Sequence, residues 1–370
     1  MHTADNHIGM KFSNKEYPQK VKEKLLEERL NALKRIVDNA NETHCHFLVI
    51  AGDLFDSVNV KSGDIKATVK ILNSFAGEAV LIVPGNHDFF ESSSGTLWDK
   101  FHKEADEQKL FILSEYAPQE FNIKDQKLVF FPACCKSKHS EENMIGWVAK
   151  ETLEPEAINI GIAHGNVEGM GLDEREKYFN MKPQELKDSK LDFWLLGHIH
   201  VPYPKTSVST NPGYFMPATH TPDGWDRKHG GYCWLIEVDE KKSIKADLIE
   251  TGSIKFFDLK WQLNSLDDFE KLVMELNSLD KLNSMLRIEL NGRLKMEDLA
   301  KARNKLQQLN DEFLFFQSND LLNEYIDQAY INALYPNDSI PHQLLSSLIS
   351  ADDDGLALQL ANELIEKSKL

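Results

Sequence analysis

Residues 46–56 read His-Phe-Leu-Val-Ile-Ala-Gly-Asp-Leu-Phe-Asp, and residues 79–88 read Ala-Val-Leu-Ile-Val-Pro-Gly-Asn-His-Asp. In both stretches a short apolar run ends at a glycine, which is typical of a buried strand followed by a turn. Residues 65–75 between them have the pattern of a helix. The order strand, helix, strand predicts a layered α/β sheet with polar side chains at its strand ends.

The same pattern extends on both sides of this segment. Residues 18–40 repeat apolar side chains at helical spacing and indicate an amphipathic helix. Further apolar strands are expected at residues 128–131, 158–163, 193–196 and 232–238. The predicted fold class of this part of the chain is therefore α/β.

The pattern changes after about Gly252. Strands and helices then alternate as a compact β-α-β-α-β unit, with strands at 256–261, 285–290 and 313–316 and helices at 266–279 and 296–309. Beyond Pro336 two helical pieces follow, at 343–349 and 356–367. We therefore expect a catalytic domain over residues 1–252, a second domain over 253–335 and a helical tail over 336–370.

The composition is that of a globular protein outside the membrane. Of 370 residues, 41% are hydrophobic and 27% are charged, and no apolar run approaches the roughly 18–20 residues of a membrane span. No signal peptide precedes the first polar motif. The cysteines form no C-x-x-C pair, which favours free thiols and a cytoplasmic location; they are Cys45, Cys134, Cys135 and Cys233.

The formal net charge of −17 argues against a uniformly basic nucleic-acid surface. It does not exclude a nuclease, because metal cations can neutralise substrate phosphates locally. Two lysine groups follow the first two motifs, at positions 11, 15, 20, 22 and 24 and at positions 61, 66 and 70. The second group is best explained as a solvated helix face, whereas the first group can equally be a solvated face or contact substrate.

Five short polar motifs lie after predicted strands. They are Asp5-Asn6-His7, Gly52-Asp53-Leu54-Phe55-Asp56, Gly85-Asn86-His87-Asp88, Ala163-His164-Gly165 and Gly197-His198-Ile199-His200. Each alone is more often a turn, a surface group or a hydrogen-bonded core histidine. Together they supply two carboxylates, four imidazoles, one amide and a spare histidine. Ligands of open α/β sheets bind at the carboxyl ends of strands, so the five motifs predict one site.

The chemistry that fits this set is two-metal phosphodiester hydrolysis. Two cations about 3.5–4 Å apart lower the pKa of a bridging water and clamp phosphoryl oxygens. We expect Asp53 to bridge them. Asp5 and His7 are two residues apart on an extended segment, so they can share one cation, and His198 and His200 have the same spacing.

The donor set also indicates the metal and the acid. Mixed nitrogen and oxygen ligands suit manganese, iron or zinc, with manganese as the first choice. His87 follows Asn86 directly. If Asn86 is a ligand, His87 lies near the substrate phosphate, where it can stabilise the transition state or protonate the leaving oxygen.

The other histidines do not lie in motifs with further potential metal ligands. His220 and His229 lie on a loop rich in proline and glycine, where a structural role is favoured over substrate contact. In the same segment Trp225 could stack on a base and Arg227 could bind a phosphate, although an ordinary surface loop is the simpler interpretation. Structural or exposed roles are expected for His2, His44, His46, His102, His139 and His342.

On these motifs the chain resembles the calcineurin-like metallophosphoesterases and, among them, the SbcD-type DNA repair nucleases. The similar stretches are His2-Thr3-Ala4-Asp5-Asn6-His7-Ile8-Gly9, Ala51-Gly52-Asp53-Leu54-Phe55-Asp56 and Pro84-Gly85-Asn86-His87-Asp88. The resemblance covers roughly residues 1–250. It implies a four-layer α-β-β-α sandwich, followed by a small α+β capping domain and a helical tail.

The resemblance also implies roles for individual residues. One metal would be held by Asp5, His7, Asp53 and His200, and the second by Asp53, Asn86, His164 and His198. His87 would be the catalytic histidine. Asp56 and Asp88, in the same motifs, would support the ligands. Some relatives carry a histidine in place of Asp56, which is linked to exonuclease chemistry.

Partners follow from the same resemblance. Members of that branch favour manganese, degrade DNA ends, cut single strands near hairpins, and work as dimers bound to a coiled-coil ABC-type ATPase of the SbcC kind. The tail is similar to the helices that grip the ATPase, or it caps the chain's own core. Its apolar contacts would be Leu344, Leu345, Leu348, Ile349, Leu358, Leu360 and Leu364.

Three hypotheses about the function are compatible with these sequence features. The first is a metal-dependent DNA nuclease subunit for end processing, repair or defence. The second is a small-molecule or nucleotide phosphodiesterase or phosphatase on the same core, which the acidic charge favours. The third is a scaffold for an ATPase with a vestigial metal site, against which the complete ligand set argues.

Overall fold

The computed structural model describes residues 1–170, 178–351 and 356–368. Its contacts divide the chain into two compact units, Met1–Phe256 and Phe257–Leu370. The division after Phe256 lies close to the predicted end of the catalytic domain at residue 252. The finer split between a capping domain and a tail at residue 336 stays a prediction.

Six strands form the first sheet of the first unit, in the order β11-β10-β1-β2-β3-β4. They are β1 (His2–Thr3), β2 (Phe47–Ala51), β3 (Ala79–Val83), β4 (Leu110–Ile112), β10 (Tyr232–Val238) and β11 (Ile244–Glu250). β1 to β4 are parallel, whereas β10 is antiparallel to both β1 and β11. The carboxyl ends of β1, β2 and β3 therefore meet at one edge.

Five strands form the second sheet, in the order β5-β6-β7-β8-β9. They are β5 (Gln119–Ile123), β6 (Gln126–Ala133), β7 (Ile158–His164), β8 (Phe193–Gly197) and β9 (Tyr214–Phe215). β6 to β9 are parallel, and β5 pairs antiparallel with β6. The expected strands at 128–131, 158–163, 193–196 and 232–238 are thus confirmed.

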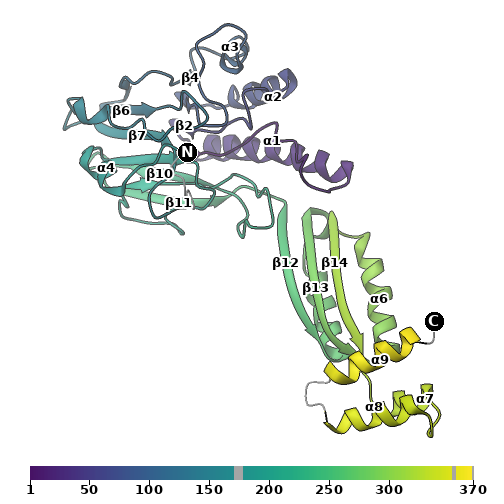
Figure 1. Ribbon diagram of the computed structural model, residues 1–370. Coiled ribbons are helices and arrows are strands. Elements are labelled where there is room, and N and C mark those ends of the chain that lie inside the picture. Colours follow the sequence, from purple (N-terminus) through teal and green to yellow (C-terminus); the bar gives the residue numbers. More distant parts are fainter. Residues whose placement is uncertain (171–177, 352–355, 369–370) are drawn as a thin grey trace. The chain divides into compact units, whose positions relative to one another are not determined.

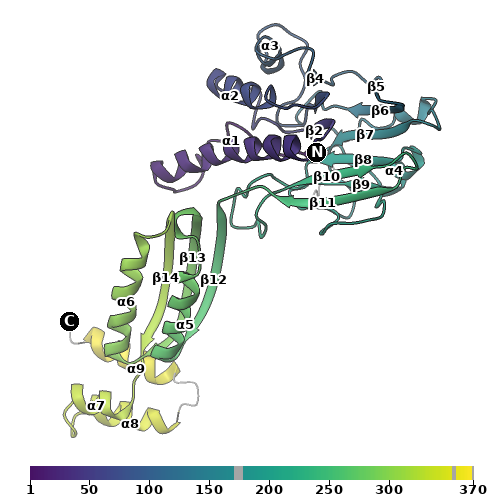
Figure 2. The same ribbon diagram turned by 180° about the vertical axis from the view of Figure 1, so that it is seen from behind.

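Helices cover the outer faces of the two sheets (Figures 1 and 2). Against the first sheet lie α1 (Gln19–Glu42), α2 (Ser62–Leu72) and α3 (Leu97–His102). Against the second lie α4 (Pro183–Asp188) and the short 3-10 helix η1 (Val148–Lys150). Apolar side chains from both sheets fill the space between them, including Phe47, Phe130, Ile160 and Trp234. The result is a four-layer α-β-β-α sandwich.

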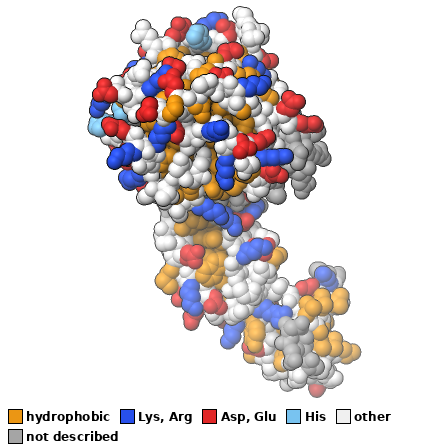
Figure 3. All heavy atoms as spheres, turned by 90° about the vertical axis from the view of Figure 1, so that its left-hand side faces the viewer, with side chains coloured by type: hydrophobic (Ala, Val, Ile, Leu, Met, Phe, Trp, Pro, Cys, Tyr) orange, Lys and Arg blue, Asp and Glu red, His pale blue; other side chains and the backbone are white. Residues whose placement is uncertain are grey.

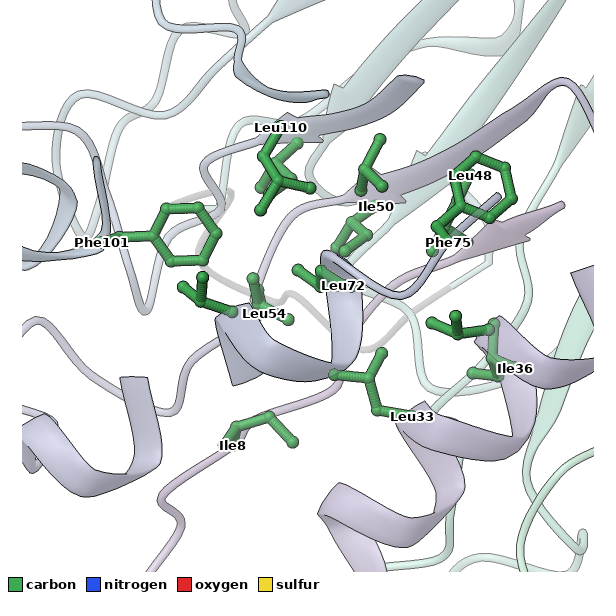
Figure 4. Close-up of a cluster of buried hydrophobic side chains, with 14 of the residues drawn as sticks. Ile8, Leu33, Ile36, Leu48, Ile50, Leu54, Leu72, Phe75, Phe101 and Leu110 are labelled. Carbon is green, nitrogen blue, oxygen red and sulfur yellow. The ribbon is translucent and has the colours of Figure 1, made fainter. Parts of the chain in front are cut away.

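The burial of α1 explains the helical spacing seen in the sequence. Leu25, Leu33 and Ile36 recur on one side of the helix and are buried against the first sheet. Figure 4 shows Leu33 and Ile36 among the side chains of β2 and α2. The predicted helix over 18–40 is confirmed. Its packing fixes the loops between β1 and α1 and between β2 and α2.

The second unit has the predicted order β-α-β-α-β. Its elements are β12 (Lys255–Leu263), which begins before the boundary, α5 (Leu266–Asn277), η2 (Lys281–Asn283), β13 (Ser284–Leu294), α6 (Met296–Asn310) and β14 (Phe315–Glu324). The strand order is β12-β13-β14, with β13 and β14 parallel. One face of this sheet packs with both helices around a core that includes Leu272, Ile288 and Leu306.

After β14 the described residues form three further helices, α7 (Gln328–Leu334), α8 (Ile340–Ala351) and α9 (Leu356–Ser368). They share a small core of Ile331, Tyr335, Leu345 and Leu358. Thus part of the apolar tail does cap its own core, while other apolar side chains of α8 and α9 stay exposed. Among the described residues, no helix combines the length and apolar character that a membrane crossing requires.

Candidate metal centre

The predicted ligands follow strands of both sheets. Asp5 comes after β1, Asp53 after β2 and Asn86 after β3, whereas His164 ends β7 and His198 follows β8. Parallel strands of the two packed sheets bring these ends together. The loops that carry the motifs therefore converge. Asp5 and His200, which face each other, are 195 positions apart in the sequence.

Three side chains form the first ligand group. Ligand atoms of Asp5, His7 and His200 all lie within 4.8 Å of one another. His200 Nε2 is 3.5 Å from Asp5 Oδ1 and 3.3 Å from His7 Nε2. Asp53 Oδ2 lies 3.7 Å from His7 Nε2. The structure thus brings together all four residues expected around the first cation.

A second group lies on the other side of Asp53. Asp53, His164 and His198 have ligand atoms within 4.8 Å of one another, and His164 Nε2 is 3.2 Å from Asp53 Oδ2. Asn86 Oδ1 lies 3.1 Å from His164 Nε2 and 3.1 Å from His198 Nδ1. Because Asp53 faces both groups, its position suits the predicted bridge.

Backbone contacts fix the protonation of one ligand. His164 Nδ1 lies 2.9 Å from the carbonyl oxygen of Ala51, so Nδ1–H donates to that oxygen and Nε2 is the atom that faces Asp53 and Asn86. Gly52 and Gly85 lie next to Asp53, and because they have no side chain they leave room for His164 and Asp53. A Cβ on Gly52 would lie 2.1 Å from His164 Nδ1, and one on Gly85 would lie 2.3 Å from Asp53 Oδ1.

Charge is concentrated in this buried site. Burial raises the pKa of Asp5 and Asp53, but neighbouring histidines outweigh that effect and lower both values, so both carboxylates are ionised. Burial lowers the pKa of His164, yet Asp53 and Asp5 raise it to about 9. Burial lowers the pKa of His7 to about 3. The pair of buried anions is the electrostatic setting in which cations bind.

The donor set fits two divalent cations. Two imidazole nitrogens, His7 Nε2 and His200 Nε2, face each other at 3.3 Å. A cation placed between these two atoms could accept a lone pair from each. Carboxylate, imidazole and amide donors together suit manganese, iron or zinc rather than a cysteine-type zinc site.

His87 lies at the edge of the ligand set. Its Nδ1 donates to the carbonyl oxygen of Asp56 at 2.8 Å, and its backbone N–H donates to Asp53 Oδ1 at 2.8 Å. The ring meets that of His7 edge-on, with centroids 4.8 Å apart. His87 also has a ligand atom within 4.8 Å of His7 and Asp53. Its separation from the metals therefore stays a prediction.

Asp56 and Asp88 support the loops. Asp88 accepts hydrogen bonds from the backbone N–H groups of Phe55, at 3.0 Å, and Gly85, at 2.7 Å, so it ties the loop after β2 to the loop after β3. Burial and the charge of Asp53 raise the pKa of Asp88 to about 7. The Asp56 carboxylate lies 3.7 Å from His7 Nδ1, and burial raises its pKa.

The segment after β9 supplies a residue that the sequence did not single out. Asp223 Oδ2 lies 3.6 Å from His200 Nδ1 and 3.6 Å from Arg29 Nη2. Arg29, on α1, also donates to the Asn6 carbonyl oxygen at 2.7 Å. One signal did exist in the sequence: Arg29 falls between Leu25 and Leu33 on the buried stripe of α1, where a cation needs a partner.

The other candidates in that segment have protein partners. His220 is buried with Nε2 2.8 Å from the Arg29 carbonyl oxygen, and His229 Nε2 lies 3.0 Å from the His200 carbonyl oxygen. Arg227 pairs with Asp223 at 3.4 Å and with Asp226 at 3.3 Å. The ring of Trp225 packs edge-on against Phe256. These contacts are those of a structural loop.

Comparison with known proteins gives the family. The sequence model of the calcineurin-like phosphoesterases matches residues 1–202. The chain belongs to this family. The family is one of phosphoesterases that use divalent metal ions, and the matched region contains every candidate ligand described above.

One curated relative is similar to part of the chain. It is the uncharacterized metallophosphoesterase YhaO of Bacillus subtilis (strain 168), which is 25% identical over 209 residues. The match covers 54% of this chain and 48% of the relative. The chain thus spans about half the length of this relative.

Proposed function

We propose that this calcineurin-like phosphoesterase is a metal-dependent DNA nuclease subunit that acts with an SbcC-like coiled-coil ATPase. The observation that carries the proposal is the second unit. A β-α-β-α-β body and three terminal helices follow a metal centre that is already complete in the first unit. A small ester needs no such additional body, whereas a long polymer substrate and a large partner do.

The site can be assigned roles for this chemistry. A cation pair, which we propose to be manganese, would supply charge neutralisation and a water of lowered pKa. Asp5, His7 and His200 would hold one cation, and Asn86, His164 and His198 the other, with Asp53 between them. His87 keeps its Nδ1–H on the Asp56 carbonyl oxygen, so its Nε2 is the atom that would stabilise a phosphoryl oxygen or protonate the leaving oxygen.

The terminal helices support an ATPase partner. Leu344 on α8 is 44% exposed, and Leu360 and Leu364 on α9 are 51% and 67% exposed. Exposed leucines on neighbouring helices are what an amphipathic coiled coil would cover. We propose this surface as the ATPase contact, in a homodimeric assembly in the cytoplasm.

The partner surface can be tested by a matched pair of variants. Leu364→Lys should weaken co-purification with the co-expressed coiled-coil ATPase of the same genome by at least tenfold. Ala357→Lys adds the same charge at another exposed position of α9 and should leave the complex intact. Equal capture of both variants would remove the proposed contact.

A small-molecule phosphodiesterase is the alternative, favoured by the net charge of −17. On the face shown in Figure 3, acidic and basic side chains are interspersed. The decisive assay incubates the protein and manganese with labelled single-stranded, hairpin and blunt duplex DNA, beside a chromogenic phosphodiester. DNA cleavage that His87→Ala abolishes supports the nuclease. Turnover of the small ester without DNA cleavage, even with the ATPase present, would refute it.

A test in cells distinguishes the scaffold hypothesis from the nuclease proposal. If the protein only recruits an ATPase, His87→Ala will preserve cellular function while deletion of residues 336–370 abolishes it. The nuclease proposal expects both changes to abolish function. Survival of function in the His87→Ala strain would therefore favour the scaffold.

A further inference from the structure

His200 lies between two carboxylates that are far apart in the sequence, Asp5 and Asp223. Its Nε2 faces the first ligand group, 3.5 Å from Asp5 Oδ1 and 3.3 Å from His7 Nε2. Its Nδ1 faces away from that group, is buried without a hydrogen-bond partner, and lies 3.6 Å from Asp223 Oδ2. Both ring nitrogens therefore face a carboxylate. With a cation on the side of Asp5 and His7, Nε2 would present its lone pair to the cation and the proton would stay on Nδ1, toward Asp223.

Asp223 is itself held in place. Its side chain is 11% exposed and lies between two guanidinium groups, with Arg29 Nη2 3.6 Å from Oδ2 and Arg227 Nε 3.4 Å from Oδ1. Arg29 is buried and donates to the Asn6 carbonyl oxygen at 2.7 Å. One arginine therefore joins Asp223 to the loop that carries Asp5 and His7.

We propose that Asp223 is a positioning residue of the metal centre. It keeps the Nδ1–H tautomer of His200 and the ring orientation that presents Nε2 to the cation shared with Asp5 and His7, and Arg29 anchors Asp223 for this task. Asp223 lies outside the five motifs. The inference goes beyond the proposed substrate, because it concerns the metal centre and applies equally to DNA and to a small ester.

Manganese binding by the full chain tests this role without any substrate. The protein is stripped with EDTA, dialysed and titrated with manganese chloride by calorimetry. Asp223→Asn keeps the shape of the side chain but removes its charge, and should weaken one of two sites by about 10–100-fold while the other is unchanged. Asp226→Asn is the control: its carboxylate is in the same segment, pairs with Arg227 and is 71% exposed. It should leave both affinities unchanged.

A second measurement separates positioning from general loosening of the loop. In a His200→Ala background, Asp223→Asn should cause no further loss of affinity, because its effect passes through His200. Circular dichroism checks folding of every variant. If Asp223→Asn does not fold, Arg29→Lys replaces it, with the same loss expected at one site. Wild-type affinity at both sites, or an equal loss in the His200→Ala background, would overturn the proposal.

Discussion

Replacing Arg29 by methionine should destabilise the first unit strongly, even without metal. The side chain is 1% exposed, and it serves both the Asn6 carbonyl oxygen and the Asp223 carboxylate. Arg29→Met would leave the largely buried Asp223 carboxylate with Arg227 as its remaining guanidinium partner, and the Asn6 carbonyl oxygen without this donor. Removing one partner of a buried ion pair costs about 3–5 kcal/mol of unfolding free energy.

The expected loss of unfolding free energy corresponds to a measurable shift of Tm, whose magnitude depends on the size of the unit. For a unit of about 250 residues, each kcal/mol shifts Tm by about 2–4 °C, so Arg29→Met should lower Tm by roughly 6–20 °C. Calorimetry in EDTA measures this shift, because bound metal then contributes nothing. The control is Lys34→Met, on the same helix, where the lysine is 59% exposed and pairs only with Asp38. It should change Tm by about 2 °C or less.

The double variant Arg29→Met with Asp223→Asn decides whether the ion pair is the cause. Once the carboxylate is gone, losing the guanidinium leaves no unpaired buried charge, so the double variant should lose less stability than the two single variants together. The expected coupling is about 0.5–3 kcal/mol. Additive losses, or a Tm for Arg29→Met within 2 °C of the control, would refute this account of the buried pair.

Three further outcomes follow from the site. His87→Ala should retain both manganese ions in metal analysis and lose about 10²–10⁴-fold in kcat; loss of metal instead would make His87 a ligand. Asp53→Ala should lose both ions, and full occupancy would exclude the bridge. Gly52→Ala should bind metal weakly and lower Tm, because its Cβ would lie 2.1 Å from His164 Nδ1. Calorimetric manganese affinity equal to wild type would contradict that reasoning.

Long apolar runs and polar strand ends were sufficient to predict the central architecture. Strands β2, β3, β7 and β8 are continuous buried runs, and each ends at a motif, so their positions could be predicted from the sequence. The short edge strands were missed. β9 has two residues and β4 has three, and neither is long enough to show a period. α7 was missed as well, because seven residues give fewer than two full turns to show the apolar repeat.

Only part of the site could be predicted from the sequence. Residues that follow strands could be grouped, because parallel strands end at a common edge. Asp223 follows no strand and belongs to no motif, and its contact with His200 depends on how the loop after β9 folds back. Arg29 could be suspected from its place on an apolar stripe, but its partner could not. Contacts between side chains of irregular loops leave no periodic pattern in the sequence from which they could be predicted.

Hydrogen bonds between chain segments hold several of the candidate ligands in unusual backbone conformations. Asp5, His7, Asp53 and His198 all have positive φ, at 53°, 44°, 52° and 94°. Such conformations cost on the order of 1–3 kcal/mol each in a residue with a side chain. Hydrogen bonds from Asp5 N to the Gly52 carbonyl, from His7 N to the Asp53 carbonyl and from His198 N to the Asp5 carboxylate hold three of them. Contacts between chain segments thus offset the backbone strain at these candidate ligands.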